Sequence, residues 1–373
     1  MDPTGPTARR FPLIARPRPA CVPLHQRVAD LRERAQAAER DSDMAAASAV
    51  HNLAALLASD VGLPDLARQC CHRHTMVYLR ARPLDAKAAI RALEPLVNLA
   101  RLHIRDGHGE HAFTLLDTFY TAVASRADTT LDGIPLPAAT LTASPDAHQE
   151  LRRWLWAVLL ATGARALARA GHWNQACTQL HRHKGIGRRL FDGRQVAVLA
   201  RATAGDTHSA LALLADTLPG EPWENAVTAC LTALCRQHTD QPADPDTLLD
   251  RYQHLDTHPG LAVFHTRLGL SIIDATGDIE HPAARRITAD LLHRATTTPD
   301  GYTARDLLHH DGCASVLTDH QTHHLTETVH ACALGSRAIP APLQADLTAA
   351  LDNSEAVLTR TLKHHPASTQ PAR

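Results

Sequence analysis

The chain is poor in aromatic residues and has no long uninterrupted apolar run. Aromatics make up 3% of its 373 residues, whereas hydrophobic residues make up 44%, most of them Ala and Leu. Such residues favour helices and close helix packing over a β-sheet core. No apolar stretch approaches the roughly 20 residues that cross a bilayer. Pro12, Pro17 and Pro19 interrupt the region behind Arg9 and Arg10 where a signal peptide would be apolar. We therefore expect a cytoplasmic protein that has no contact with a membrane.

The sequence also lacks an excess of one charge, paired cysteines and recognisable catalytic motifs. Its net charge is -1, which gives no general attraction to nucleic acid. Its eight cysteines form no CxxC pair, so we expect reduced and mostly buried thiols. We find no nucleophile elbow, kinase signature or paired-cysteine zinc site. These absences favour a protein that is not an enzyme, and we expect no cofactor.

A short spaced signature recurs four times, each time between two apolar helix-like runs. In each copy an alanine follows a glycine by five residues. The pairs are Gly62/Ala67, Gly107/Ala112, Gly171/Ala176 and Gly205/Ala210. Glycine can adopt the positive φ that ends a helix, so each pair predicts the turn of a helical hairpin.

Around these turns the sequence divides into hairpins, loops and tails. Residues 1–24 are rich in Pro and Arg, and we expect them to be disordered. Residues 25–222 are expected to form a charged helix and hairpins at about 43–80, 86–124, 148–183 and 186–218, with a long exposed loop at 128–146 and no strand. Residues 223–365 are expected to form a helical C-terminal extension, and residues 366–373 a second disordered tail.

These hairpins resemble the tetratricopeptide repeat, a helix-turn-helix unit of 34 residues. The best copy places Gly171, Trp173 and Ala176 where that family has its glycine, aromatic residue and alanine. The first two spacings between signatures are 45 and 64 residues instead of 34. The resemblance therefore implies an all-α fold, an irregular α-solenoid of stacked hairpins with a right-handed superhelix. The Ala-, Arg- and His-rich composition also resembles that of actinobacterial proteins.

The resemblance further implies a groove, because the first helices of successive hairpins line one surface of such arrays. Matching positions place seven residues on or near that surface. They are Asn52, Asn98, Arg101, Arg105, Arg165, Arg169 and Gln195. Guanidinium groups suit carboxylates, and amide side chains can bond to an extended peptide backbone. These residues predict a groove for an acidic or extended peptide segment, although arginines on a solvated helix surface would give the same pattern.

Histidine is abundant, with 26 residues, and the densest cluster offers a metal hypothesis. His320, His324 and Glu327 share one helix face, a spacing that suits metal ligands. A solvated polar face is the alternative. The basic stretch 184–189 has two glycines but no phosphate-loop ending, so it favours a turn and makes a nucleic-acid partner unlikely.

Together these features predict a protein- or peptide-binding scaffold or regulator whose partner is unknown. They are compatible with a homo- or hetero-oligomer. Two alternatives remain open. One is an accessory or catalytic subunit that handles a peptide substrate in a specialised biosynthetic pathway. The other is a ligand- or peptide-responsive regulator that acts with a separate DNA-binding chain.

Overall fold

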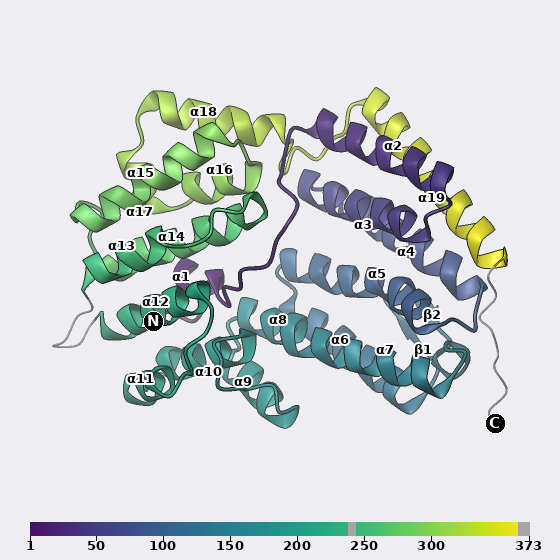
Figure 1. Ribbon diagram of the computed structural model, residues 1–373, viewed down its shortest axis with the longest axis horizontal. Coiled ribbons are helices and arrows are strands. Elements are labelled where there is room, and N and C mark those ends of the chain that lie inside the picture. Colours follow the sequence, from purple (N-terminus) through teal and green to yellow (C-terminus); the bar gives the residue numbers. More distant parts are fainter. Residues whose placement is uncertain (238–243, 365–373) are drawn as a thin grey trace. The chain divides into compact units, whose positions relative to one another are not determined.

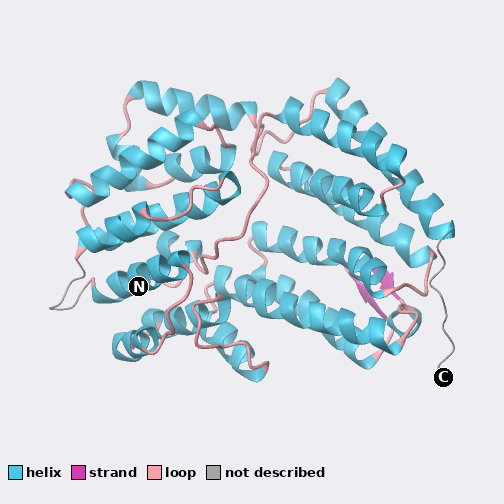
Figure 2. Ribbon diagram, viewed as in Figure 1, coloured by secondary structure: helices cyan, strands magenta, loops and turns pink. Residues whose placement is uncertain are grey.

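The computed structural model describes residues 1–237 and 244–364, and the described chain is all-α, as the sequence predicts (Figures 1 and 2). Within these residues, one two-stranded antiparallel sheet accounts for the β-structure. The predicted tail at 366–373 lies outside the described residues. The described chain forms two compact units, and each is treated by itself.

Unit 2 contains residues 24–166 and the described residues from Ala333 onward. Its helices are α2 (Leu24–Asp41), α3 (Met44–Val61), α4 (Pro64–Arg80), α5 (Ala86–Arg105), α6 (Gly109–Ser125), α7 (Pro145–Val158) and α19 (Ala341–His364). Its shorter elements are β1 (Thr129–Leu131), β2 (Ile134–Leu136), the 3-10 turn η1 (Ala138–Thr140) and the π-helical turn η2 (Leu159–Gly163). One apolar core joins α2, α3, α4, α5 and α19.

Unit 1 contains residues 1–23 and 167–332. Its helices are α1 (Pro6–Arg10), α9 (Trp173–Arg182), α10 (Asp192–Thr203), α11 (Thr207–Ala215), α12 (Pro222–Arg236), α13 (Pro245–Gln253), α14 (Ala262–Thr276), α15 (Pro282–Thr297), α16 (Gly301–Leu308), α17 (Asp311–Val316) and α18 (Asp319–Ala331), with a 3-10 turn η3 (Pro259–Leu261). The boundary between the units falls inside α8 (Ala164–Arg169).

The four predicted hairpin turns form with one common geometry. Gly62, Gly107, Gly171 and Gly205 all have φ between +83° and +87°. In each turn the residue after the glycine donates its N–H to the carbonyl five residues earlier, as His172 does to Leu167 at 2.9 Å. This is the bond pattern of a Schellman helix end. All four signature alanines are fully buried, so the small side chain lets the second helix pack closely.

The segment 1–23, called the leading segment below, is folded instead of disordered. It includes α1, and Ala8, Phe11, Leu13 and Cys21 are all buried in unit 1. Its path is the purple trace along the helices of unit 1 in Figure 1. The high Pro and Arg content suggested disorder, but each proline removes one backbone donor that burial would leave unsatisfied, and the apolar residues between the prolines reach a core.

The predicted exposed loop at 128–146 also differs, because it contains the β1–β2 hairpin. Leu131, Ile134 and Leu136 of this hairpin are buried. Asp132-Gly133 forms the turn with positive φ at both residues. Asp-Gly between alternating apolar residues is a strong hairpin signal, which the threonines and prolines of this stretch obscured.

The C-terminal third does not form one extension. Residues up to Cys332 belong to unit 1, whereas α19 belongs to unit 2 and packs on α2, α3 and α4. Arg73 of α4 joins Glu355 and Asp352 of α19 at 2.7 Å each. No local sequence signal indicates that α19 packs on helices about 300 residues earlier in the chain. The sequence prediction therefore grouped α19 with the helices that precede it in sequence.

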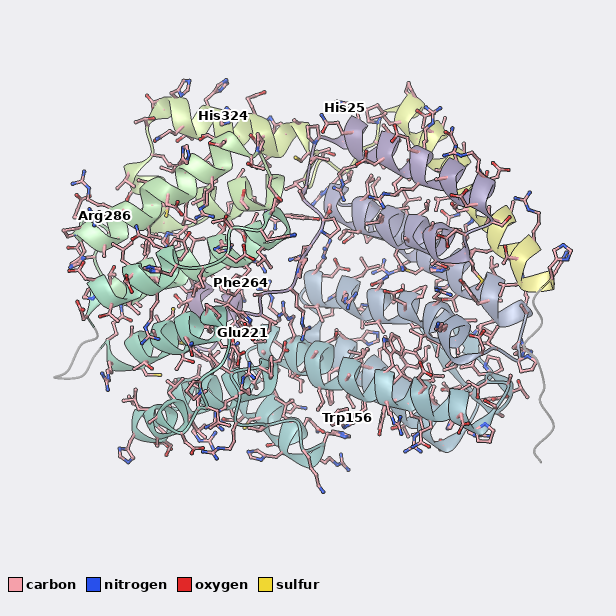
Figure 3. All side chains as sticks on the ribbon, in the orientation of Figure 1. His25, Trp156, Glu221, Phe264, Arg286 and His324 are labelled. Atoms are coloured by element: carbon pink, nitrogen blue, oxygen red, sulfur yellow. The ribbon has the colours of Figure 1, made fainter. Side chains whose placement is uncertain are left out.

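Two expectations drawn from composition have structural counterparts. All eight cysteines lie in the described part of the chain, where they are buried and form no disulfide. Among the described helices, α3 is long and apolar enough to cross a membrane by length and composition, but about half of it is buried inside the structure. Ten of its residues pack as an ordinary core helix would, which makes α3 weak evidence for a membrane span. Trp156 departs from the packing expected of a tryptophan in an apolar run, since it is 39% exposed (Figure 3).

Candidate functional site: the leading segment on unit 1

The side chain of Gln195 forms two hydrogen bonds with the backbone of the leading segment. Gln195 lies in α10 and is fully buried. Its Oε1 accepts the N–H of Leu13 at 2.7 Å, and its Nε2 donates to the carbonyl of the same residue, also at 2.7 Å. A carboxamide can complete both bonds of one extended residue in this way. One of the seven predicted groove residues therefore bonds to the backbone of the leading segment.

Other side chains and backbone groups of unit 1 also bind the backbone of this segment. Trp173 Nε1 donates to the carbonyl of Pro3 at 2.9 Å, and Arg169 Nη1 donates to the carbonyl of Arg9 at 3.0 Å. Farther along, the N–H of Arg18 donates to the carbonyl of Gly260 at 2.9 Å. These hydrogen bonds go to main-chain groups of the segment and not to its side chains, as in the recognition of an extended peptide.

Carboxylates of unit 1 bind the basic residues of the segment. Asp274 of α14 accepts from Arg10 Nη1 at 2.7 Å and from the hydroxyl of Thr7. His310 Nε2 contacts the other oxygen of Asp274 at 2.9 Å. Asp192 accepts from Arg16 Nη2 at 2.9 Å. The charge on this face therefore suits a basic segment at two points.

The bond between Asp274 and His310 changes the titration of both groups. Burial by itself would lower the pKa of His310, but the interactions with Asp274 and Cys313 together outweigh burial and raise that pKa to about 9. Burial opposes ionisation of Asp274, yet the bonds from His310, Arg10 and Thr7 lower its pKa overall. The leading segment is thus held to α14 by an ionised network.

The segment does not fill the whole face. A cavity of about 570 Å³ remains beside its first residues. Its lining combines Asp2 and Thr7 of the segment with Asp274, Gln237 and His310 of the helices.

A cluster of arginines surrounds one acidic residue on the same unit. Partial burial and the positive charges of Arg267 and Arg9 lower the pKa of Arg169. Asp306 is the acidic partner there, and it pairs with Arg267 Nε at 2.9 Å and with Arg305 at 3.6 Å. This cluster carries more positive than negative charge.

In unit 2 the predicted groove residues bind one another. Asn52 of α3 donates to Glu94 of α5 at 2.9 Å, and Asn98 donates to Asn52 at 3.0 Å. Arg101 then donates to Asn98 at 2.9 Å. These four residues form a polar ladder between α3 and α5, and their bonds occupy both polar atoms of the Asn52 amide.

Arg105 lies beyond this ladder and is held by an acidic residue. Its Nη1 donates to Asp60 at 2.9 Å and to Ser59 at 2.7 Å. Arg27 of α2 binds the other oxygen of Asp60 at 2.8 Å. Since Asp60 is almost fully buried, its two arginines neutralise a charge that would otherwise be costly.

The structure thus separates the predicted residues into two groups. Asn52, Asn98, Arg101 and Arg105 lie together on unit 2, whereas Arg169 and Gln195 both contact the leading segment on unit 1. Arg165 is half-buried on α8. Sequence reasoning missed Asp192 and Asp274, because the ligand they bind was itself expected to be disordered.

For a metal, the structure brings together a different set from the predicted one. Among the described residues, the group of three that could hold an ion is His103 of α5, His111 of α6 and Asp132 of the β1–β2 turn. His320, His324 and Glu327 all lie on α18 and do not belong to such a group (Figure 3). Two histidines flanking the turn at Gly107 were a signal in the sequence, but only folding adds Asp132.

Comparison with protein families, with curated proteins and with solved structures finds no match to this chain.

Proposed function

We propose that this protein is a non-catalytic scaffold that binds extended peptides, and that the binding face lies on unit 1. The observation that carries the proposal is the pair of bonds from Gln195 to the backbone of Leu13. A buried amide with both atoms on one ligand residue recognises extended backbone whatever the side chain. In this chain the leading segment occupies that face.

The contacts of the leading segment indicate which peptides would suit the face. Phe11 and Leu13 are buried, and Arg10 immediately before them is bound by Asp274. The ligand class is therefore an extended segment in which a basic residue is followed by an apolar residue, then by any one residue, and then by a second apolar residue. This class matches the extended peptide that the sequence predicts, but its charge at these positions is basic.

An acidic residue has a separate place on the same unit. Arg169, Arg267 and Arg305 share Asp306 as their acidic neighbour, so a ligand carboxylate near Arg169 would compensate the remaining positive charge. The acidic residue of the peptide that the sequence predicts would therefore bind at this arginine cluster.

The hairpin geometry supports an irregular tetratricopeptide-like array as the scaffold. Four turns share one pattern of hydrogen bonds, one sign of φ at glycine and one fully buried alanine. Stacked hairpins place successive helices side by side, which allows α8, α10 and α14 to contribute contacts to one bound chain.

The test keeps the leading segment but makes it replaceable. A protease site is inserted after Pro23, the purified protein is cleaved, and a fluorescent synthetic peptide of residues 1–23 is added. We expect the labelled peptide to replace the cleaved segment and to raise the fluorescence anisotropy. Gln195→Ala removes the two hydrogen bonds to the segment, worth about 1 kcal/mol each, so the peptide should dissociate roughly tenfold to thirtyfold faster.

Two controls isolate the contribution of the backbone bonds. Gln253→Ala makes the same change at an exposed glutamine of α13 and should leave exchange unaltered. A peptide N-methylated at Leu13 keeps every side chain but loses the N–H that Gln195 Oε1 accepts. It should bind more weakly than the normal peptide, but by less than Gln195→Ala causes, because the bond from Gln195 Nε2 to the Leu13 carbonyl remains. Failure of any peptide to exchange, or equal rates in both glutamine variants, would show that the segment is a fixed part of the core.

A further inference from the structure

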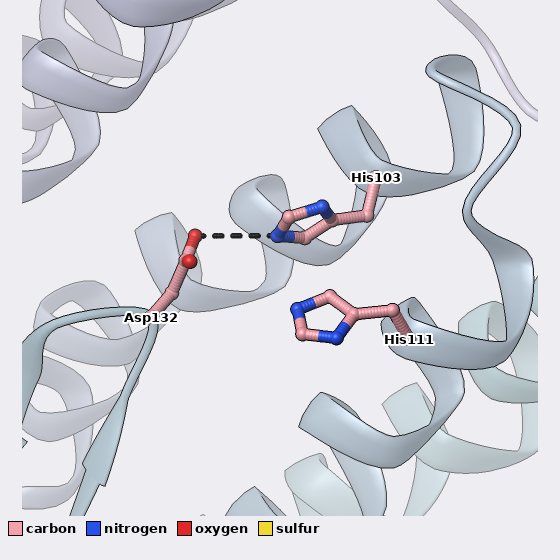
Figure 4. Close-up of side chains that lie close together, drawn as sticks. All are labelled: His103, His111 and Asp132. Atoms are coloured by element: carbon pink, nitrogen blue, oxygen red, sulfur yellow. Dashed lines mark hydrogen bonds and ion pairs between the residues drawn. The ribbon is translucent and has the colours of Figure 1, made fainter.

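Three metal-binding side chains from three separate elements converge in unit 2 (Figure 4). His103 comes from α5, His111 from α6 and Asp132 from the turn between β1 and β2. One ligand atom of each lies within 4.8 Å of the other two. His103 Nε2 and Asp132 Oδ2 are 3.3 Å apart.

The distance between His103 Nε2 and Asp132 Oδ2 fits a shared ion better than a direct bond. Charge-assisted bonds between nitrogen and a carboxylate are about 2.7–2.9 Å long. Ligand atoms around a tetrahedral zinc ion, at roughly 2.0–2.2 Å from the metal, lie about 3.3–3.5 Å from one another. The separation of His103 and Asp132 matches the second value.

Two of the ligands are fixed by the fold and the third can adjust. His103 is buried, and within the described residues its Nδ1 has no hydrogen-bond partner, so its polar contact is on the side of Asp132. Asp132 is held by the hairpin register and has φ of +48°. His111 is exposed, so rotation of its side chain can bring its ring nitrogen to the distance from the other two ligand atoms that coordination requires.

We propose that His103, His111 and Asp132 bind a divalent transition-metal ion, with zinc as the best-fitting ion. Two imidazoles and one carboxylate match the ligands that zinc accepts, whereas magnesium and calcium prefer oxygen ligands alone. Three protein ligands leave one position for water or another ligand. The bound ion would join the β1–β2 hairpin to α5 and α6.

The proposal does not depend on peptide binding, because its residues belong to unit 2 and are not those that contact the leading segment. The experiment uses the full chain without a histidine tag, stripped with a chelator and titrated with zinc by calorimetry. We expect one tight site per chain. His103→Ala and Asp132→Asn should each weaken that site by about a hundredfold. Cobalt absorption in the visible range reports the same coordination directly.

The 26 histidines of the chain make matched controls essential. His108→Ala changes a neighbouring exposed histidine, whose ring centroid lies 6.5 Å from that of His103, and His320→Ala changes the densest histidine cluster. Both should keep the tight site and the cobalt spectrum. The absence of a stoichiometric site, or a site that survives in His103→Ala and Asp132→Asn, would overturn the proposal. Circular dichroism of each variant shows that the loss does not come from unfolding.

Discussion

The two units pair the polar groups described above in different ways. In unit 1, Asp274, Asp192 and Gln195 bind a separate stretch of chain, the leading segment. In unit 2, the polar ladder and Asp60 are satisfied by neighbouring helices. A polar group that is paired with a separate segment becomes available to a ligand when that segment leaves. A polar group that is paired with a neighbouring helix stabilises the scaffold instead. This difference separates the face that we propose for ligands from one that resembles it in sequence.

Buried histidines show the same contrast. His310 of unit 1 is bonded to Asp274, and its pKa is raised to about 9. His51 and His74 of unit 2 stack with ring centroids 5.2 Å apart, and their four ring nitrogens have no hydrogen-bond partner among the described residues. Burial lowers the pKa of His51 to about 4 and that of His74 well below its ordinary value. The His310 site and the His51–His74 pair should therefore respond to pH in opposite directions.

The largest effect is expected from Asp274→Asn. This change leaves Arg10 and His310 without their carboxylate, and breaking a buried ion pair on one side costs about 3 kcal/mol. Chemical denaturation measures the loss, and limited proteolysis should show faster cleavage within the leading segment. Asp60→Asn, the matched change in unit 2, should also destabilise the protein but leave that segment protected. Equal protection of the leading segment from proteolysis in both variants would contradict the difference that we infer between the two units.

Alkaline pH should weaken unit 1 through His310. Because its folded pKa is raised from 6.5 to about 9, the stabilisation is complete below pH 6.5 and is lost as pH rises to about 9. The loss should reach at most about 3 kcal/mol. Denaturation curves across this range measure it, and His310→Gln should flatten the dependence. A slope that is unchanged in this variant would rule out His310 as its source.

Acidic pH should weaken unit 2 through His51 and His74. Their folded pKa values lie below 6.5, so the unfolded state takes up protons first, and stability falls as pH drops from 6.5 toward 4. His51→Leu keeps a similar volume and should reduce this fall. His25→Leu on the exposed face of α2 is the control and should not (Figure 3). The measurement is the difference in unfolding free energy between the two variants at pH 5.

The smallest effect compares two signature glycines with nearly equal backbone angles. Gly107 of unit 2 has open space around it, so Gly107→Ala should cost about 1–2 kcal/mol for a left-handed alanine. At Gly171 a new Cβ would also come within 2.8 Å of Thr4 in the leading segment. Gly171→Ala should therefore cost about 1 kcal/mol more in urea denaturation. Adding Thr4→Ala should remove that excess, and persistence of the excess would place its cause elsewhere.

Local features of this fold could be predicted from the sequence. The helices and the hairpin turns depend on residues within one or two turns of chain, such as Gly171 and its neighbours. The β1–β2 hairpin was missed although its signal was local, because Asp132-Gly133 lay among residues typical of loops. Of the candidate peptide site, the sequence predicted Gln195 and Arg169 but not what they bind.

By itself, the sequence determined the helical class of this protein, the four glycine turns and the burial of their alanines, because each follows from backbone conformation and local packing. Tertiary structure alone decided that residues 1–23 lie on unit 1, that α19 packs on α2, and that Asp132 meets His103 and His111. These contacts join residues between 21 and more than 300 positions apart. The free energy that selects them comes from burial and charge pairing in the folded chain, which no short stretch of sequence contains.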